Sequence, residues 1–252
     1  MLSKENLEKV ARLLLNAESV IFFTGAGVSK ESGIPTFRDA MTGLWANYDP
    51  EELATPSAFR RNPTLVWQWY DERRSKLLEV RPNPGHEAIA EFEKCLPQVH
   101  VVTQNVDGLH KVAGSTDVIE LHGNISEFFC FDRRHPASAP IPYGLKEPPN
   151  CHCGSLMRPA VVWFQEALPE GELERAQSLI LKSSILFVVG TSSLVQPAAS
   201  LPLLAMQNKI PVIEVNPDET PLSRRADLLI RSGSGKALPE ILRTFQSLQS
   251  QA

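Results

Sequence analysis

Apolar residues along this chain follow two alternating spacings. Between residues 4 and 17 they recur every three or four positions, which predicts an amphipathic helix capped by Ser3, and the apolar run 20–24 that follows predicts a buried strand. Further strands are predicted at 99–103, 118–121, 185–189, 212–215 and 228–230. Helical patterns separate most of them, so the sequence predicts an α/β fold: a Rossmann-like parallel sheet with helices on both faces.

Two stretches interrupt this alternation. Asn62 and Pro63 open a predicted helix that runs through residue 78, and its inward stripe is Val66, Trp69, Tyr70, Arg73 and Leu77. Residues 124–157 hold five prolines and three of the four cysteines, with little periodicity. We therefore expect one domain over 1–252, with a Rossmann-like large part (1–38, 82–123 and 158–252) and a small inserted part (39–81 and 124–157).

Composition narrows the class of partner. The chain has 252 residues, 42% of them hydrophobic, and 25 basic against 29 acidic residues give a net charge of -4. With no excess of positive charge, the sequence does not predict non-specific binding to nucleic acid or to a membrane surface. No signal peptide or spanning run is visible, and four cysteines without such a signal suit reduced thiols. We expect a cytoplasmic monomer.

Polar or glycine-rich clusters follow five of the predicted strands, at 24–33, 104–107, 122–123, 190–193 and 216–218. Because ligands bind beyond the carboxyl ends of parallel strands, these clusters predict one crevice. The first, rich in glycine, predicts a nucleotide site. The dinucleotide fingerprint G-x-G-x-x-G fails because Lys30 stands at the third glycine, which disfavours a dehydrogenase.

Five motifs in the same order resemble the sirtuin family. They are residues 25–38, 103–110 (TQNVDGLH), 121–123 (LHG), 158–164 (RPAVVWF) and 190–193 (GTSS). The resemblance implies an NAD-dependent protein-lysine deacylase that consumes NAD as co-substrate. The acyl oxygen would attack the nicotinamide-bearing ribose carbon, giving free lysine, nicotinamide and O-acyl-ADP-ribose.

The resemblance also implies residue roles. The catalytic residues would be His122, as general base, and Asn105; a histidine at a strand end is otherwise more often structural. The residues implied to bind NAD are Gly25, Ala26, Gly27, Thr36, Phe37, Arg38, Gln104, Asn105, Asp107, Gly190, Thr191, Ser192, Asn216, Ser234 and Gly235. The residues implied to bind the acyl-lysine peptide are Ala54, Tyr70, Arg73, Val161, Trp163 and Phe164, with 161–164 as an edge strand. Asp107 by itself would more often be a helix N-cap.

Tyr70 and Arg73 share one helix face, where a guanidinium in an apolar stripe needs an anion. The anion can be internal, for example Asp71 or Glu72, or the side chain can reach out to solvent. The Tyr-x-x-Arg pattern, with Ala54 and Thr36, resembles class III sirtuins, which implies succinyl, malonyl or glutaryl substrates and weaker deacetylation.

The cysteine pattern departs from the two pairs that hold zinc in most sirtuins. Cys130 has Arg133 where a partner is expected, and the second pair is reduced to Cys151-His152-Cys153. We therefore predict no metal ligand, and a module held by prolines and packing. The alternative is a Cys₃His zinc site completed by His135 or His152.

Two other functions fit the same residues. A protein mono-ADP-ribosyltransferase shares the NAD-cleaving site and differs in the acceptor. A non-catalytic NAD-sensing module is compatible with the degenerate cysteines, although His122, Asn105 and Asp107 argue against it.

Overall fold

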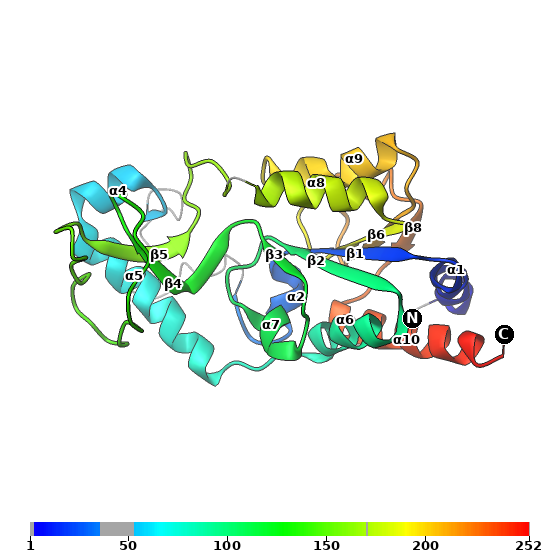
Figure 1. Ribbon diagram of the computed structural model, residues 1–252. Coiled ribbons are helices and arrows are strands. Elements are labelled where there is room, and N and C mark those ends of the chain that lie inside the picture. The colour runs from blue at the N-terminus through cyan, green and yellow to red at the C-terminus, as the bar shows by residue number, and fades with distance from the viewer. Residues whose placement is uncertain (1–2, 36–52, 170, 252) are drawn as a thin grey trace.

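A six-stranded parallel sheet forms the large part of the molecule (Figure 1). The computed structural model describes residues 3–35, 53–169 and 171–251. In sheet order the strands are β3 (Val118–Glu120), β2 (Gln98–Thr103), β1 (Ser19–Thr24), β6 (Ile185–Val189), β7 (Val212–Val215) and β8 (Leu228–Ile230). All five pairings are parallel, with Thr24 opposite both Thr103 and Val189. The predicted Rossmann-like sheet is confirmed.

Helices cover both faces of the sheet because its central strands are apolar on both sides. Along β1, Phe22 packs on one face, with its ring 4.9 Å from that of Phe187, while Ile21 and Phe23 pack on the other. The first face carries α1 (Lys4–Leu15), α6 (Pro84–Cys95) and α10 (Ser234–Gln249). The second carries α8 (Glu172–Lys182), η3 (Ala198–Ser200) and α9 (Leu201–Gln207), as Figure 1 shows.

Short elements join the sheet to the site. The glycine-rich loop after β1 contains a helix of one turn and a half, α2 (Ala26–Lys30), and α7 (Leu109–Ala113) lies between β2 and β3. The first part of the glycine-rich motif is therefore helical. The described segment ends at residue 35, so Thr36, Phe37 and Arg38 lie outside the described residues.

The small part lies beside the carboxyl ends of the strands (Figure 1). It contains α4 (Pro56–Arg61), α5 (Pro63–Lys76), η2 (Leu77–Glu79) and the antiparallel pair β4 (Gly123–Cys130) and β5 (Met157–Val161). Its core gathers Phe59, Val66, Trp69, Tyr70 and Trp163.

One expectation about α5 was incomplete. The predicted stripe is present, but Trp67, Asp71 and Arg74 are buried as well. The cause is segment 141–146, which crosses the opposite side of the helix: Arg74 donates to the carbonyls of Ile141 and Pro142, and Gly144 N donates to Asp71. The helix also ends at Lys76 and continues as a 3₁₀ turn.

Among the described residues, no helix is long and apolar enough to cross a membrane.

Candidate functional site

The first glycine loop lies directly on the loop after β6. Gly27 N donates to Gly190 O at 2.8 Å, and a Cβ on Gly27 would lie only 2.7 Å from Gly190 Cα. Gly190 has a φ of 61°, and its own Cβ would lie 2.5 Å from Val28 N. Only glycine allows backbones to approach this closely. The two glycines therefore bring the ends of β1 and β6 together, as predicted for the clusters that follow these strands.

Ser29 is the centre of a buried polar network at this edge. Its hydroxyl donates to Asp107 Oδ2 at 2.7 Å and accepts from Asn105 Nδ2 at 3.0 Å. Asn105 Nδ2 also donates to Gly25 O at 3.1 Å. In the described part of the chain no hydrogen bond uses Asn105 Oδ1, so this oxygen can accept from a ligand.

Asp107 is not the helix N-cap considered from the sequence, because Gly108 holds that position in α7. Its Oδ1 accepts from Leu109 N at 2.9 Å, across the turn that leads into the helix. Its Oδ2 faces Ser29, within the strand-end cluster. Burial raises the pKa of this carboxyl, and the hydrogen bonds from Leu109 and Ser29 offset part of that rise.

Two buried histidines, one of them against Ser29, lie next to this network, and no sequence motif assigned them a role. His86 Nδ1 accepts from Asn83 N, so its proton lies on Nε2, 3.5 Å from Ser29 Oγ. His110 Nε2 lies 2.9 Å from Thr24 Oγ1, and the two imidazole rings are 4.8 Å apart. Burial lowers the pKa of His86 to about 4 and that of His110 to about 3, so both are neutral at pH 7.

His122 follows β3 and is held in one tautomer. Its Nδ1 lies 3.0 Å from Gln104 O, and because a carbonyl only accepts, Nδ1 carries the proton and Nε2 carries the free lone pair. Burial lowers the pKa of His122, and the bond to Gln104 offsets part of that effect. A neutral imidazole with an exposed basic nitrogen can act as a general base at pH 7.

The backbone next to His122 joins the sheet to the small part. Gly123 has a φ of 76°, and a Cβ there would lie 2.0 Å from Ala160 O. Val162 N donates to His122 O at 2.9 Å. His122 is thus fixed to segment 161–164; of the edge strand predicted there, only Val161 lies in a strand, at the end of β5.

A buried ion pair supports that segment. Arg158 donates through both terminal nitrogens to the Glu166 carboxylate, at 2.7 and 3.0 Å, and its guanidinium lies 3.2 Å from the centre of the Trp163 ring. Glu166 also accepts from Trp163 N at 2.8 Å, and Phe164 N donates to Ala54 O at 2.9 Å. Val161 and Trp163 are buried, whereas Phe164 is exposed.

Tyr70 and Arg73 lie in the apolar cluster that contains Ala54. The Tyr70 ring packs edge-on against Trp69, 4.6 Å away, and the Arg73 guanidinium lies 4.9 Å from the Trp69 ring. Burial lowers the pKa of Arg73, partly offset by Tyr70, and it raises the pKa of Tyr70. Asp71, one internal anion considered for Arg73, is paired instead with Arg74.

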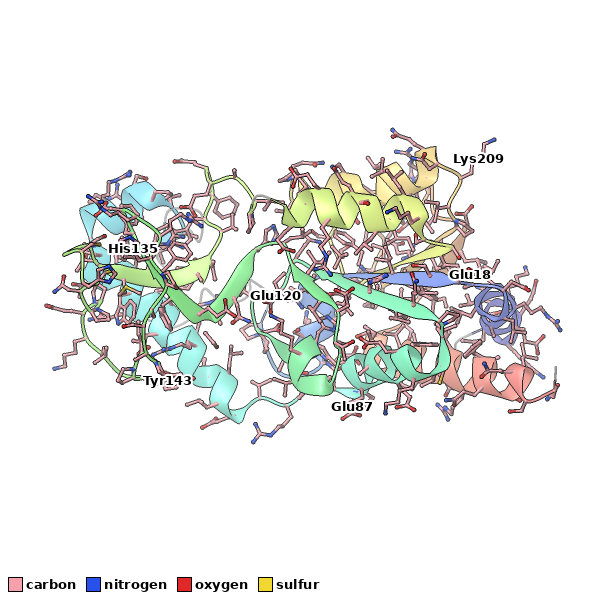
Figure 2. All side chains as sticks on the ribbon, in the orientation of Figure 1. Glu18, Glu87, Glu120, His135, Tyr143 and Lys209 are labelled. Carbon is pink, nitrogen blue, oxygen red and sulfur yellow. The ribbon has the colours of Figure 1, made fainter. Side chains whose placement is uncertain are left out.

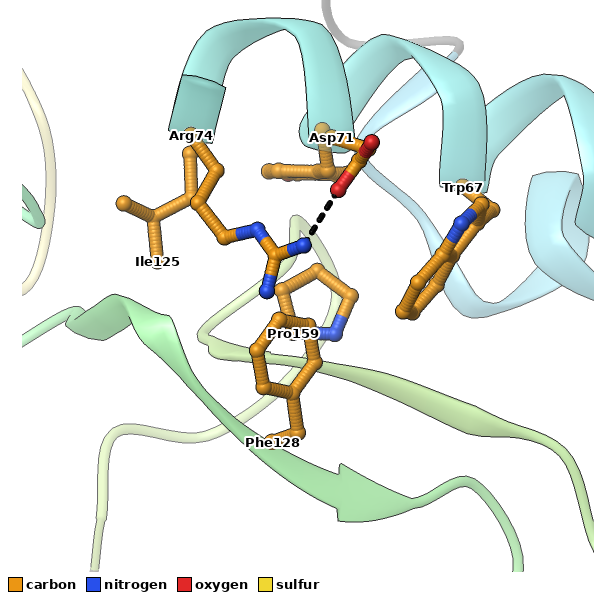
Figure 3. Close-up of a pocket in the computed structure, with 7 residues that line it drawn as sticks. Trp67, Asp71, Arg74, Ile125, Phe128 and Pro159 are labelled. Atoms are coloured by element: carbon orange, nitrogen blue, oxygen red, sulfur yellow. Dashed lines mark hydrogen bonds and ion pairs between the residues drawn. The ribbon is translucent and has the colours of Figure 1, made fainter. Parts of the chain in front are cut away.

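Arg74 and Asp71 occupy the other side of α5 (Figure 3). The guanidinium donates to Asp71 Oδ1 at 2.5 Å, above Phe128 and beside Pro159. The hollow at this pair leaves no room for a water molecule. It is a packed structural contact that fastens segment 141–146 to the helix.

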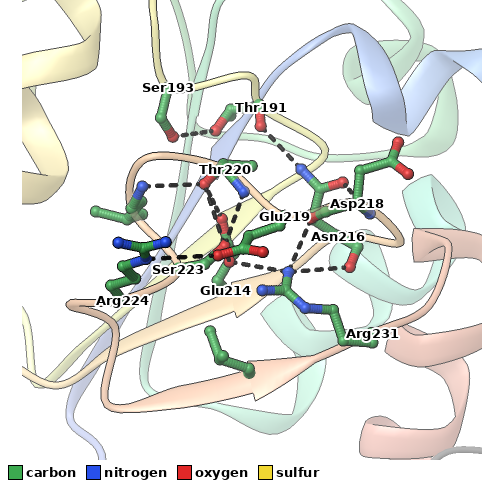
Figure 4. A network of polar contacts seen from close by, with 12 residues as sticks. Thr191, Ser193, Glu214, Asn216, Asp218, Glu219, Thr220, Ser223, Arg224 and Arg231 are labelled. Atoms are coloured by element: carbon green, nitrogen blue, oxygen red, sulfur yellow. Dashed lines mark hydrogen bonds and ion pairs between the residues drawn. The ribbon is translucent and has the colours of Figure 1, made fainter.

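Thr191 and Asn216, two of the residues predicted to bind NAD, belong to a second polar network (Figure 4). Asn216 Nδ2 donates to Thr191 O at 2.8 Å, which joins the loops after β7 and β6. Fully buried Glu214 accepts from Ser223 Oγ at 2.6 Å, from Thr220 Oγ1 and from Arg231. Arg231 also donates to Asp218 O at 2.8 Å. Sequence reasoning missed Glu214 and Arg231, because neither the charge inside β7 nor the one just after β8 has a local signal.

Ser234 and Gly235, at the start of α10, contact the end of α2. Ser234 Oγ and Gly235 N both donate to Glu31 Oε1 at 2.9 Å. Thr191 Oγ1 lies 3.0 Å from Ser193 Oγ within the β6 loop.

The cysteines of the small part converge although their spacing is degenerate. One atom each of Cys130, His135, Cys151 and Cys153 lies within 4.8 Å of the others. Cys130 Sγ and Cys153 Sγ are 3.8 Å apart, which matches two sulfurs on a tetrahedral zinc with Zn–S bonds of about 2.3 Å. The His152 ring stacks on His135 from outside this set. The donor set fits zinc, and it selects His135 of the two histidines considered.

The fold and this cluster of polar strand-end residues are typical of an α/β enzyme that uses a nucleotide, and the comparisons with known proteins give the family. The Sir2 family matches residues 25–197. An NAD-dependent protein deacylase 1 of Caldanaerobacter subterraneus subsp. tengcongensis is 53% identical over 222 residues, covering 85% of this chain and 88% of the relative. An NAD-dependent protein deacylase of Aquifex aeolicus is 48% identical, covering 88% and 93%.

Solved structures agree. A Sir2 homologue in complex with NAD has a TM-score of 0.88 at 42% identity and covers 98% of this chain and 94% of that one. Sir2Af2 bound to a myristoylated histone peptide has a TM-score of 0.79 at 32% identity, covering 99% and 100%. This chain belongs to the Sir2 family and is an NAD-dependent protein deacylase, which confirms the prediction from the sequence.

Proposed function

We propose that this deacylase removes acidic acyl groups, such as succinyl, malonyl and glutaryl, from protein lysines, in preference to acetyl. The observation that carries this proposal is the Arg73 guanidinium, half-buried against the Trp69 ring and beside Tyr70, which packs in the apolar cluster that also contains Ala54 and Trp163. A carboxylate would pair with the guanidinium and accept from the hydroxyl. An acetyl group ends in a methyl and offers neither interaction.

The site around His122 supports the chemistry. NAD, the co-substrate, supplies the electrophilic ribose carbon and the nicotinamide leaving group. Asn105 Oδ1 is available to accept from the nicotinamide carboxamide, and Asp107 lies beside it through Ser29. His122 Nε2 is the basic nitrogen and would take a ribose hydroxyl proton.

The segment 161–164 would receive the substrate as an added strand. Its N–H groups at Val162 and Phe164 are bonded to His122 O and Ala54 O, and that of Trp163 to Glu166, which holds the segment rigid before binding. A rigid edge lowers the entropy cost of binding an extended peptide.

A panel of peptides that differ only in the acyl group tests the preference, with NAD present and nicotinamide and deacylated peptide read by mass spectrometry. We expect higher kcat/KM for succinyl or malonyl than for acetyl peptides. Arg73→Met should lower kcat/KM for the acidic peptides by about 10- to 100-fold, the value of a charged hydrogen bond, and leave acetyl turnover within a few-fold. Tyr70→Phe, which keeps the ring packing, should have a smaller effect of the same sign.

Arg61→Met is the matched control, because Arg61 is an exposed arginine on the neighbouring helix α4. Equal rates on all acyl peptides for the unmodified protein would contradict the acidic preference. ADP-ribose attached to a protein without acyl loss would favour the transferase instead.

A further inference from the structure

Gln165 adopts a backbone conformation that glycine adopts at lower cost. Its φ is 72°, and among the described residues three other non-glycine residues have positive φ: Arg134, Ser193 and Lys209. In this region the Cβ of an L-residue crowds its own backbone, so a long side chain there costs free energy.

The surroundings of Gln165 force this conformation. On one side Phe164 N is bonded to Ala54 O at 2.9 Å. On the other, the Glu166 carboxylate is held by Arg158 and Trp163 N, and Glu166 N donates to Trp163 O at 3.0 Å. Both neighbours are fixed, so the residue between them has no freedom to relax.

The fold does not use the side chain that is kept at this cost. Gln165 is exposed, and in the part of the chain that the structure describes its amide makes no hydrogen bond. It directly follows the segment 161–164 and neighbours the exposed Phe164 ring. A strained residue with an unused amide at the end of a binding edge indicates a function outside the fold.

We propose that the Gln165 side-chain amide binds the backbone of a substrate residue next to the acyl-lysine, so that the enzyme selects an extended peptide over an isolated acyl-lysine. A primary amide both donates and accepts, so it can pair with a peptide N–H and C=O irrespective of the side chain. The contact therefore favours any extended peptide and not one sequence. This inference rests on the proposed peptide-binding role of 161–164 but not on the acyl preference.

The test compares an acyl-lysine peptide with Nα-acetyl-lysine amide that carries the same acyl group. Gln165→Gly relieves the strain and removes the amide, whereas Gln165→Ala keeps the strain and removes the amide. We expect both variants to lose about tenfold in kcat/KM on the peptide, the value of one or two hydrogen bonds, with no change on the small substrate or in KM for NAD. Anisotropy of a labelled peptide with ADP-ribose present gives the same comparison without turnover.

Lys209→Gly is the matched control, because Lys209 is also exposed, has a φ of 59° and lies in the turn after α9, away from the carboxyl ends of the strands (Figure 2). Neither glycine variant should lower the unfolding midpoint, and Lys209→Gly should leave peptide turnover unchanged. Unchanged peptide kcat/KM in both Gln165 variants would overturn the inference, and so would a loss in Gln165→Gly alone, which would assign the effect to backbone freedom. If the acidic acyl preference fails, the comparison still holds with acetyl substrates.

Discussion

The free energy of unfolding of this chain depends on pH because the fold buries the histidine pair His86 and His110. Protonation of His86 would place a proton on Nδ1, against the N–H of Asn83, and protonation of His110 would bury a second N–H on Nδ1, which has no partner in the described residues. Both imidazoles therefore bind protons more weakly in the folded chain than in the unfolded chain. The free energy of unfolding has its full value above the ordinary histidine pKa of 6.5. It falls as the pH drops toward the pKa values in the folded chain, about 4 for His86 and about 3 for His110.

The size of this loss follows from how far the pH lies below the unfolded pKa of 6.5. At about pH 5 each histidine is protonated in the unfolded chain and still neutral in the folded chain. Each therefore lowers the free energy of unfolding by about 1.5 pH units times about 1.36 kcal/mol per unit, or about 2 kcal/mol. The pair together would remove about 4 kcal/mol between about pH 8 and about pH 5, a large share of the stability of a typical domain.

Urea unfolding followed by tryptophan fluorescence at both pH values measures this loss. His86→Gln should reduce the pH-dependent loss by about 2 kcal/mol even if it lowers stability at both pH values, because only the difference between the two is compared. The control is His152→Gln, which replaces an exposed histidine and should leave the difference unchanged. A loss in His86→Gln equal to that of the unmodified protein would refute the reasoning.

Three further predictions concern the metal, the base and Arg231. Protein purified without chelator should contain about one zinc per chain by metal analysis. The variant His135→Ala should lose this zinc, whereas His152→Ala should keep it. Unmodified protein without metal would refute the donor set. His122→Tyr should abolish turnover but still bind ADP-ribose by calorimetry. Because burial lowers the pKa of His122, the acid limb of the pH profile of kcat/KM in the unmodified protein should lie below pH 6.5. Retained turnover in the variant, or an acid limb above pH 6.5, would contradict the assignment of His122 as the base. Arg231→Met should raise KM for NAD by about tenfold with kcat unchanged, whereas exposed Arg224→Met should not, and equal values of KM would exclude a positioning role for Arg231.

Much of the fold could be predicted because its cause is local. Runs such as 20–24 and 185–189 are apolar at every position, which is typical of a parallel strand buried on both faces, and all six predicted strands exist. The convergence of the glycine loops followed from topology, since the carboxyl ends of parallel strands share one edge.

The site was predicted where a motif lies within one loop. Asn105 and Asp107 come from a single strand end, and the structure joins them through Ser29, a residue of the first glycine motif. His86 and His110 were not assigned, because each is an isolated histidine in the sequence and only packing brings their rings together.

The sequence by itself determined the strands, the order of the motifs and the family, because these depend on periodicity and on residue types within a few positions. The tertiary structure decided which charges pair: Asp71 binds Arg74 and not its neighbour Arg73, since segment 141–146 encloses one side of α5. It also brought His135 to three cysteines whose spacing argued against a metal, because donors separated along the chain converge only when β4 and β5 pair. Charge pairing and ligand geometry are set by distances in space, which a one-dimensional pattern does not contain.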